Sequence, residues 1–222
     1  MKKLNLILLL ILFKTAAFSQ KKIYNIVTYG AKADGITNNT SSIQKAINAA
    51  AIQGGVVLIP AGNFVTGVIY LKSNIELQLV ANARLMATTK RIDYGSKKAS
   101  ALIVADDAHD VSITGKGVID GQAAPLLKDI YRMLNNGTLE DAEWKKYNDW
   151  GQMRPAEDNR PHIIDFTNCS KINIKGITIR DGLCWIQDYI NCSNMVIDSI
   201  TVESNTFLNN DGIDLVDCKN VK

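Results

Sequence analysis

Several residue types are scarce in this chain of 222 residues, and each scarcity excludes a class of protein. Only two histidines occur, His109 and His162, so a metal site built from several histidines is excluded. Four prolines and 15 glycines are too few for a collagen-like or proline-rich architecture. The net charge of +3 comes from Lys2, Lys3 and Lys14; without them, 22 basic residues balance 22 acidic ones. A neutral chain is not a strongly basic nucleic-acid binder, and we expect no nucleic-acid partner.

Long hydrophobic runs are also missing, apart from one short segment near the N-terminus. Two lysines precede the apolar residues 6–13, and Ala17-Phe18-Ser19 follow. This order is typical of a secretory signal peptide, so we expect residues 1–19 to be one. The eight apolar residues fall far short of the ~20 that a membrane-spanning helix needs. No cysteine lies near the cleavage site to carry a lipid anchor. We therefore expect a secreted or periplasmic protein that has no membrane contact after signal cleavage.

Cysteine is confined to the last quarter of the chain, at Cys169, Cys184, Cys192 and Cys218. Export permits disulfides, but three of the four fall at one phase of a sequence repeat. We interpret them as small buried hydrophobic residues, and leave their disulfide state open.

The repeat becomes visible when segments are aligned on these cysteines. Residues 168–179 are similar to residues 191–202, which lie 23 positions later, and Asp217 begins a third copy after another 26. Weaker copies occupy residues 74–77 and 110–113. Apolar residues alternate within each copy and Gly, Asn or Asp separate the runs, which is typical of short strands and turns.

A repeat of this length predicts an all-β fold, a parallel β-helix. No single coil can bury its inward face alone, so coils stack at the strand spacing of about 4.8 Å. A β-sandwich is disfavoured, because its strands need not keep residue identities in register at a fixed period. Stacking also predicts a side-chain amide ladder between Asn168 and Asn191.

Two segments interrupt the repeat. Thr40 or Ser41 is predicted to cap a helix over residues 43–50, which would cover the open end of the stack. Residues 123 to about 160 are predicted to form a helical insertion on one face. A binding role and a purely structural role of this insertion both remain open. The expected organisation is one β-helix domain over residues 20–222, incomplete at its C-terminus.

Counting back from each repeat cysteine predicts two columns of stacked side chains. Four positions before the cysteines are three carboxylates, Asp165, Asp188 and Asp214. Seven positions before them are His162, Trp185 and Asp211. Apolar neighbours on both sides predict that the three carboxylates face outward. Such a face suits an extended polymer such as a polysaccharide, with Trp185 stacked on a sugar ring. A purely structural role of these residues in turns remains open.

One motif resembles that of a known family. Residues 209–214, Asn-Asn-Asp-Gly-Ile-Asp, resemble the pattern Asn-Thr-Asp-Gly-Ile/Val-Asp of glycoside hydrolase family 28, which includes polygalacturonases and rhamnogalacturonan hydrolases. Residues 29–35, 54–57, 59–62, 71–75 and 117–122 resemble upstream segments of the same family. The resemblance covers essentially the whole mature chain. It implies a right-handed, pectin-lyase-like β-helix and a pectic polysaccharide as substrate, either homogalacturonan or rhamnogalacturonan.

The resemblance also implies residue roles. Hydrolysis of α-linked galacturonic acid would invert the anomeric configuration, with Asp211 as the catalytic base that activates water. The expected substrate-binding residues are Asn209, Asp214, Asp188, Trp185 and His162. No metal and no other cofactor is expected, and the complete protein is expected to be a monomer.

The chain departs from the family pattern in two places. Asn210 stands where the family usually has threonine, which bears on the subfamily. The paired aspartates that include the general acid would follow Lys222. The resemblance therefore implies an N-terminal part of the enzyme that is inactive by itself.

Two other functions remain open at this point. One is a non-catalytic polysaccharide-binding β-helix, or a truncated inactive product. The other is a calcium-dependent polysaccharide lyase, in which the three stacked carboxylates hold Ca²⁺ through oxygen ligands. The pectic linkage and the choice between endo and exo action are open as well.

Overall fold

The computed structural model describes residues 21–142, 144 and 153–222. The expected signal peptide at residues 1–19 lies outside these residues. None of the helices in the described part combines the length and the apolar character that crossing a bilayer requires.

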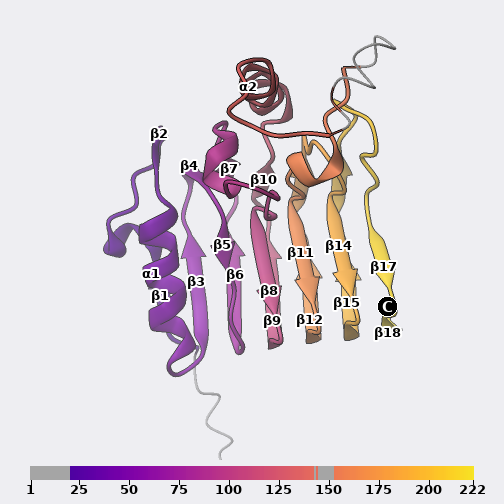
Figure 1. Cartoon of the computed structure of the whole chain (residues 1–222). Helices are drawn as coiled ribbons and strands as arrows, with labels where there is room; N and C mark the ends of the chain where they lie inside the picture. Colours follow the sequence, from indigo (N-terminus) through magenta and orange to yellow (C-terminus); the bar gives the residue numbers. More distant parts are fainter. Residues whose placement is uncertain (1–20, 143, 145–152) are drawn as a thin grey trace, which may run out of the picture.

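Three parallel sheets make up the body of the protein (Figure 1). The first sheet contains, in spatial order, β1 (Ile23–Asn25), β3 (Gly55–Ile59), β6 (Ile75–Leu79), β9 (His109–Gly115), β12 (Ser170–Lys175), β15 (Ser193–Asp198) and β18 (Lys219–Val221). The second contains β2 (Asp34–Asn38), β4 (Gly62–Thr66), β7 (Ala83–Ala87), β10 (Val118–Asp120), β13 (Thr178–Arg180) and β16 (Thr201–Glu203). The third contains β5 (Ile69–Tyr70), β8 (Ile103–Asp106), β11 (Ile164–Thr167), β14 (Gln187–Ile190) and β17 (Asp214–Val216).

Successive strands enter different sheets, and each strand pairs in parallel with its equivalents in the neighbouring coils. Figure 1 shows the coils side by side, from the indigo N-terminal coil to the yellow C-terminal one. This is a right-handed parallel β-helix, as predicted, and its handedness is the one favoured for parallel crossovers.

The core is built from stacks of apolar residues that come from successive coils. In one such stack, Leu77 of β6 pairs with Ile113 of β9, and Ile113 with Ile174 of β12. All three side chains are fully buried. Each coil therefore covers the apolar inward face of the next, which an isolated coil could not achieve.

The predicted register is confirmed. Ile172 pairs with Met195 and Met195 with Val221, so the two repeat lengths of 23 and 26 residues place equivalent residues side by side. The cysteines have free thiols; Cys169, Cys184 and Cys192 are buried. The interpretation as small buried residues is confirmed for these three, whereas Cys218 is only partly buried.

The predicted amide ladder is also present. Asn191 Nδ2 donates a hydrogen bond of 2.8 Å to Asn168 Oδ1 at the turn between the third and first sheets. Both residues have left-handed backbone, with φ of 52° and 54°. Asparagine tolerates this conformation better than other residues that carry a Cβ.

Two substitutions of Asn191 separate the backbone from the amide. Asn191→Ala is expected to lower the free energy of unfolding by about 1–2 kcal/mol, because it forces a Cβ without a local hydrogen bond into left-handed backbone. Asn191→Gly removes the same amide but accepts this backbone, so about 0.5 kcal/mol is expected. Urea unfolding measures both values. An equal loss in the two variants would contradict the assignment of most of the cost to the backbone.

The N-terminal helix α1 (Thr40–Ala51) lies at the end of the stack, as predicted (Figure 1). The prediction of Thr40 or Ser41 as its cap is wrong, because the N-cap residue is Asn39. The Asn39 side chain makes no capping bond; its amide oxygen accepts from the backbone N–H of Lys32 instead. The Thr40 hydroxyl accepts from the backbone N–H of Gly67 and ties the start of the helix to the sheet.

Helix α1 packs against the first coil through Ile43, Ala46, Ile47 and Ala50, all fully buried. It therefore covers apolar residues at the end of the stack that water would otherwise reach.

The predicted insertion contains α2 (Ala123–Asn135) and the short 3₁₀ helix η3 (Glu157–Asn159). Helix α2 lies beyond the ends of the strands (Figure 1), and its buried Leu126 and Ile130 belong to the same apolar core as the coils. Trp144 is buried and packs on Tyr131 of this helix, with ring centroids 5.5 Å apart. Two further 3₁₀ helices, η1 (Ile26–Tyr29) and η2 (Arg91–Tyr94), lie upstream.

Candidate active site

The predicted carboxylate column lies on the third sheet. Asp165 of β11 pairs with Asp188 of β14, and Asp188 pairs with Asp214 of β17. Three carboxylates thus sit on consecutive strands, about 4.8 Å apart along the stack. We call Asp165, Asp188 and Asp214 the Asp column.

The Asp column is less exposed than an outward-facing row of acids would be. The Asp188 side chain is only 5% exposed, whereas Asp165 and Asp214 are half-buried. Among the described residues, Asp188 Oδ1 and Asp214 Oδ2 are buried and have no hydrogen-bond partner. Strand alternation predicts only the face of the sheet, and it did not reveal that Asp188 is buried.

Burial and mutual repulsion shift the protonation of these carboxyl groups. The pKa of Asp188 is raised, first by burial and then by the negative charges of Asp165 and Asp214. The pKa of Asp214 is raised by burial and by the negative charge of Asp211. The charge of Asp211 in the motif therefore affects the protonation of Asp214 in the Asp column.

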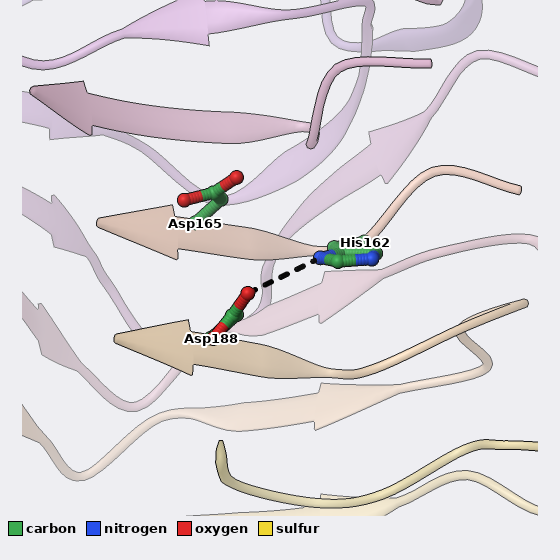
Figure 2. Close-up of side chains that lie close together, drawn as sticks. All are labelled: His162, Asp165 and Asp188. Carbon is green, nitrogen blue, oxygen red and sulfur yellow. Dashed lines mark ion pairs between the residues drawn. The ribbon is translucent and has the colours of Figure 1, made fainter. Parts of the chain in front are cut away.

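His162 and Trp185, predicted to share the second column, do lie together. Their ring centroids are 5.1 Å apart and the ring planes meet at 44°. Burial lowers the pKa of His162, although Asp165 opposes this shift. Figure 2 shows His162 just before β11, with its ring facing the Asp188 carboxylate; Nδ1 of His162 and Oδ2 of Asp188 are 3.9 Å apart.

The family-like motif lies in the turn before β17. Asp211 is exposed, and its backbone carbonyl accepts a 2.9 Å hydrogen bond from the N–H of Ile186 in the preceding coil. This bond holds the motif in register with Trp185 and the Asp column. Asn209 is exposed and has left-handed backbone, with φ of 53°.

Two residues of the insertion hold this turn, and neither was predicted from the sequence. Glu157 Oε1 accepts a 2.6 Å hydrogen bond from Asn209 Nδ2. Arg160, whose side chain is fully buried, donates from Nη1 to the carbonyls of Leu183 and Leu208, both at 2.9 Å. The paired residues are 23 to 52 positions apart in the chain, so no local sequence pattern could have revealed these contacts, apart from the rarity of a buried arginine.

A lysine adds positive charge beside the acids. Lys98 is 77% exposed and pairs with Asp158 at 3.2 Å. Its charge acts on His162 and on Asp188. It also lines a cavity of about 1120 Å³ together with Arg154 and Glu157. Lys98 therefore places one positive charge near the Asp column, in a cavity that is also lined by acidic residues.

Fold and site together define a right-handed parallel β-helix with a row of acids, an aromatic side chain and an exposed Asn-x-Asp motif along one sheet. Residues 50–222 match the model of the family described as glycosyl hydrolases family 28. The chain belongs to this family, as the motif suggested.

Three relatives illustrate the similarity. The chain is 35% identical over 140 residues to an exo-poly-alpha-D-galacturonosidase of Dickeya chrysanthemi, covering 55% of this chain and 23% of that protein. It is 26% identical over 181 residues to a probable polygalacturonase of Vitis vinifera, covering 72% and 33%. Its structure is similar to the family 28 exopolygalacturonase of Yersinia enterocolitica, with a TM-score of 0.75, 25% identity and coverage of 91% and 42%. The chain thus spans a quarter to a third of the length of these curated relatives.

Proposed function

We propose that this chain is the N-terminal part of a secreted hydrolase that cleaves α-linked galacturonic acid in pectic polysaccharides with inversion of configuration. The observation that carries the proposal is the exposed Asp211 in its family motif, held in register beside the Asp column. The names of the relatives support the pectic substrate, and the short share of their length that the chain covers supports a partial chain.

In the proposed reaction Asp211 is the base. Its exposed carboxylate accepts a proton from a water molecule as that water attacks the anomeric carbon. An inverting site needs a general acid roughly 6.5–9.5 Å from the base. One coil of rise, about 4.8 Å, plus a sideways offset gives such a separation. The acid would come from the coil after β17, so the chain of 222 residues is expected to bind substrate without cleaving it.

We propose direct sugar contacts for the accessible predicted residues. Asn209 and Asp214 would bond hydroxyl groups, and Trp185 would stack on a ring. We propose no direct sugar contact for Asp188 or for His162 beside it, since Asp188 has too little exposed surface for a polymer to contact it. A monomer is sufficient for this arrangement, because all of these residues come from one chain.

Product analysis tests the proposal. The full-length protein that carries this segment is expected to release reducing ends from polygalacturonate, without unsaturated sugars and without need of Ca²⁺. Calcium-dependent unsaturated products would instead support the lyase alternative. Binding without cleavage by the full-length protein would support a non-catalytic binding module. Comparing the loss of viscosity with the release of monosaccharide separates endo from exo action.

Lys98 provides a separate test of anion binding. Lys98→Gln is expected to weaken oligogalacturonate binding by about tenfold at low ionic strength and less at high salt, because the lysine attracts uronate carboxylates and salt screens that attraction. Isothermal titration with a galacturonate oligomer measures it. Lys171→Gln removes a lysine of similar exposure from the first sheet, and should leave the affinity unchanged. Equal losses in both variants would indicate a nonspecific charge effect.

A further inference from the structure

We propose that His162, Asp165 and Asp188 form a binding site for one divalent zinc ion. One ligand atom from each residue, a ring nitrogen or a carboxylate oxygen, lies within 4.8 Å of the other two. Asp165 and Asp188 are direct neighbours on β11 and β14, and His162 precedes β11 by two residues. Figure 2 shows the three side chains gathered on the same face of these strands. The proposal concerns cation binding and does not depend on hydrolysis.

The burial of Asp188 is the independent observation that points to a cation. The Asp188 side chain is only 5% exposed, and its Oδ1 has no hydrogen-bond partner among the described residues. An unpaired buried carboxylate is costly, and such groups in native proteins call for an explanation such as a bound ion. The other oxygen, Oδ2, faces His162 but is 3.9 Å from its Nδ1, which is too long for a hydrogen bond.

The same distance is close to that between two ligands of one metal ion. Zinc binds imidazole nitrogen and carboxylate oxygen at about 2.0–2.2 Å, so two ligands of a tetrahedral site lie about 3.3–3.6 Å apart. The 3.9 Å between Nδ1 and Oδ2 exceeds this separation by a few tenths of an ångström. The longest separation in the group, up to 4.8 Å, requires the side chains to approach by up to about 1.5 Å, which rotation of a carboxylate side chain can supply.

The donor set favours zinc over calcium. One imidazole and two carboxylates are ligands of zinc, whereas calcium takes six to eight oxygen atoms. Three protein ligands leave one tetrahedral position open for a water molecule or a ligand oxygen. The Trp185 ring packs on His162 and fixes the imidazole plane, as a supporting residue around a metal does.

Zinc titration tests the proposal directly. The purified chain is stripped with a chelator and titrated with Zn²⁺ in competition with a chromogenic chelator. One zinc ion per chain is expected. His162→Gln and Asp188→Asn are each expected to weaken binding by at least about tenfold, because each removes a ligand. His109→Gln is the matched control: it removes the other histidine, which is exposed and pairs with Asp110 at 2.9 Å.

Three outcomes would overturn the proposal: no saturable binding, unchanged affinity in His162→Gln, or loss of binding in His109→Gln. Thermal melting monitored by circular dichroism shows whether each variant is folded. Cobalt substitution gives a second readout, since visible absorption from bound Co²⁺ should be present in the unaltered chain and absent in His162→Gln. Whether or not zinc binds, the product analysis of the full-length protein still tests the hydrolase proposal. Failure of one proposal is therefore distinguishable from failure of the other.

Discussion

Asp211→Asn is expected to slow the hydrolysis of polygalacturonate by the full-length protein by orders of magnitude. The loss in kcat should be about 10²–10⁴-fold, because the substitution removes the proposed general base and keeps its size. Affinity for a galacturonate oligomer should change little, since the amide can still bond hydroxyl groups. Reducing-end assays and titration calorimetry on the same preparations separate the two quantities.

A matched control for this variant lies six residues away. Asp217 is exposed and has left-handed backbone with φ of 53°, which asparagine tolerates. Asp217→Asn should retain full activity. Activity of Asp211→Asn within about tenfold of the unaltered protein would contradict its role as base. Equal loss in the two variants would show that the last coil is generally sensitive to substitution.

Asp120→Asn is expected to cause the largest loss of stability among these variants. The Asp120 side chain is fully buried and accepts hydrogen bonds from Arg84 Nε at 2.9 Å, Arg180 Nε at 2.7 Å and the backbone N–H of Gln122 at 2.9 Å. It joins β7, β10 and β13 of the second sheet. An asparagine would turn an N–H donor toward two arginines. Removing one partner of a buried ion pair costs about 3–5 kcal/mol, and we expect about 2–4 because both arginines are partly exposed.

The same residue predicts a pH dependence of stability. Burial by itself raises the pKa of Asp120, but the bonds from Gln122, Arg84 and Arg180 outweigh it and hold the pKa below its ordinary value of 3.8. The folded state therefore binds this proton less tightly than the unfolded state. The stabilisation is complete above the unfolded pKa and is lost as the pH falls through the lower, folded pKa.

Urea unfolding of the unaltered chain and of Asp120→Asn at a series of pH values checks both statements. The difference in unfolding free energy should be constant near neutrality and shrink below about pH 4. Asp158→Asn serves as the control, because it removes a carboxylate from an exposed pair with Lys98 and should cost less than about 1 kcal/mol. If the difference in unfolding free energy between the two proteins instead grew as the pH fell, the expected direction of the pH dependence would be contradicted.

The fold could be predicted from the sequence because a β-helix repeats the same local arrangement of strands and turns in every coil. The spacing between Cys169, Cys192 and Cys218 predicted the register that pairs Asp165 with Asp188 and Asp188 with Asp214. Identical asparagines at the turn, Asn168 and Asn191, indicated the same stacking. Where each coil must bury its inward face on the next, periodicity in the chain becomes proximity in space.

The start of helix α1 shows the limit of prediction from local sequence patterns. Thr40 and Ser41 are good capping residues, yet the helix begins at Thr40, one residue earlier than a cap at Thr40 predicts and two earlier than a cap at Ser41 predicts. Asn39 is committed to the backbone of Lys32 and Val65, and the Thr40 hydroxyl to the N–H of Gly67. Contacts with Val65 of β4 and with Gly67 just after it, 26 and 27 residues away, therefore determined how the start of the helix is held.

The candidate active site, too, was only partly predictable from the sequence. By itself the sequence determined the strand alternation, the membership of the Asp column and the family motif around Asp211, because all of these depend on spacing along the chain. Only the tertiary structure decided that Asp188 is buried beside His162, and that Glu157 and Arg160 hold the turn of Asn209. The physical reason is that Glu157 and Arg160 bring the insertion back into contact with the coils. The burial of a carboxylate and the partners of a buried arginine both depend on such neighbours in space, which the sequence repeat does not encode.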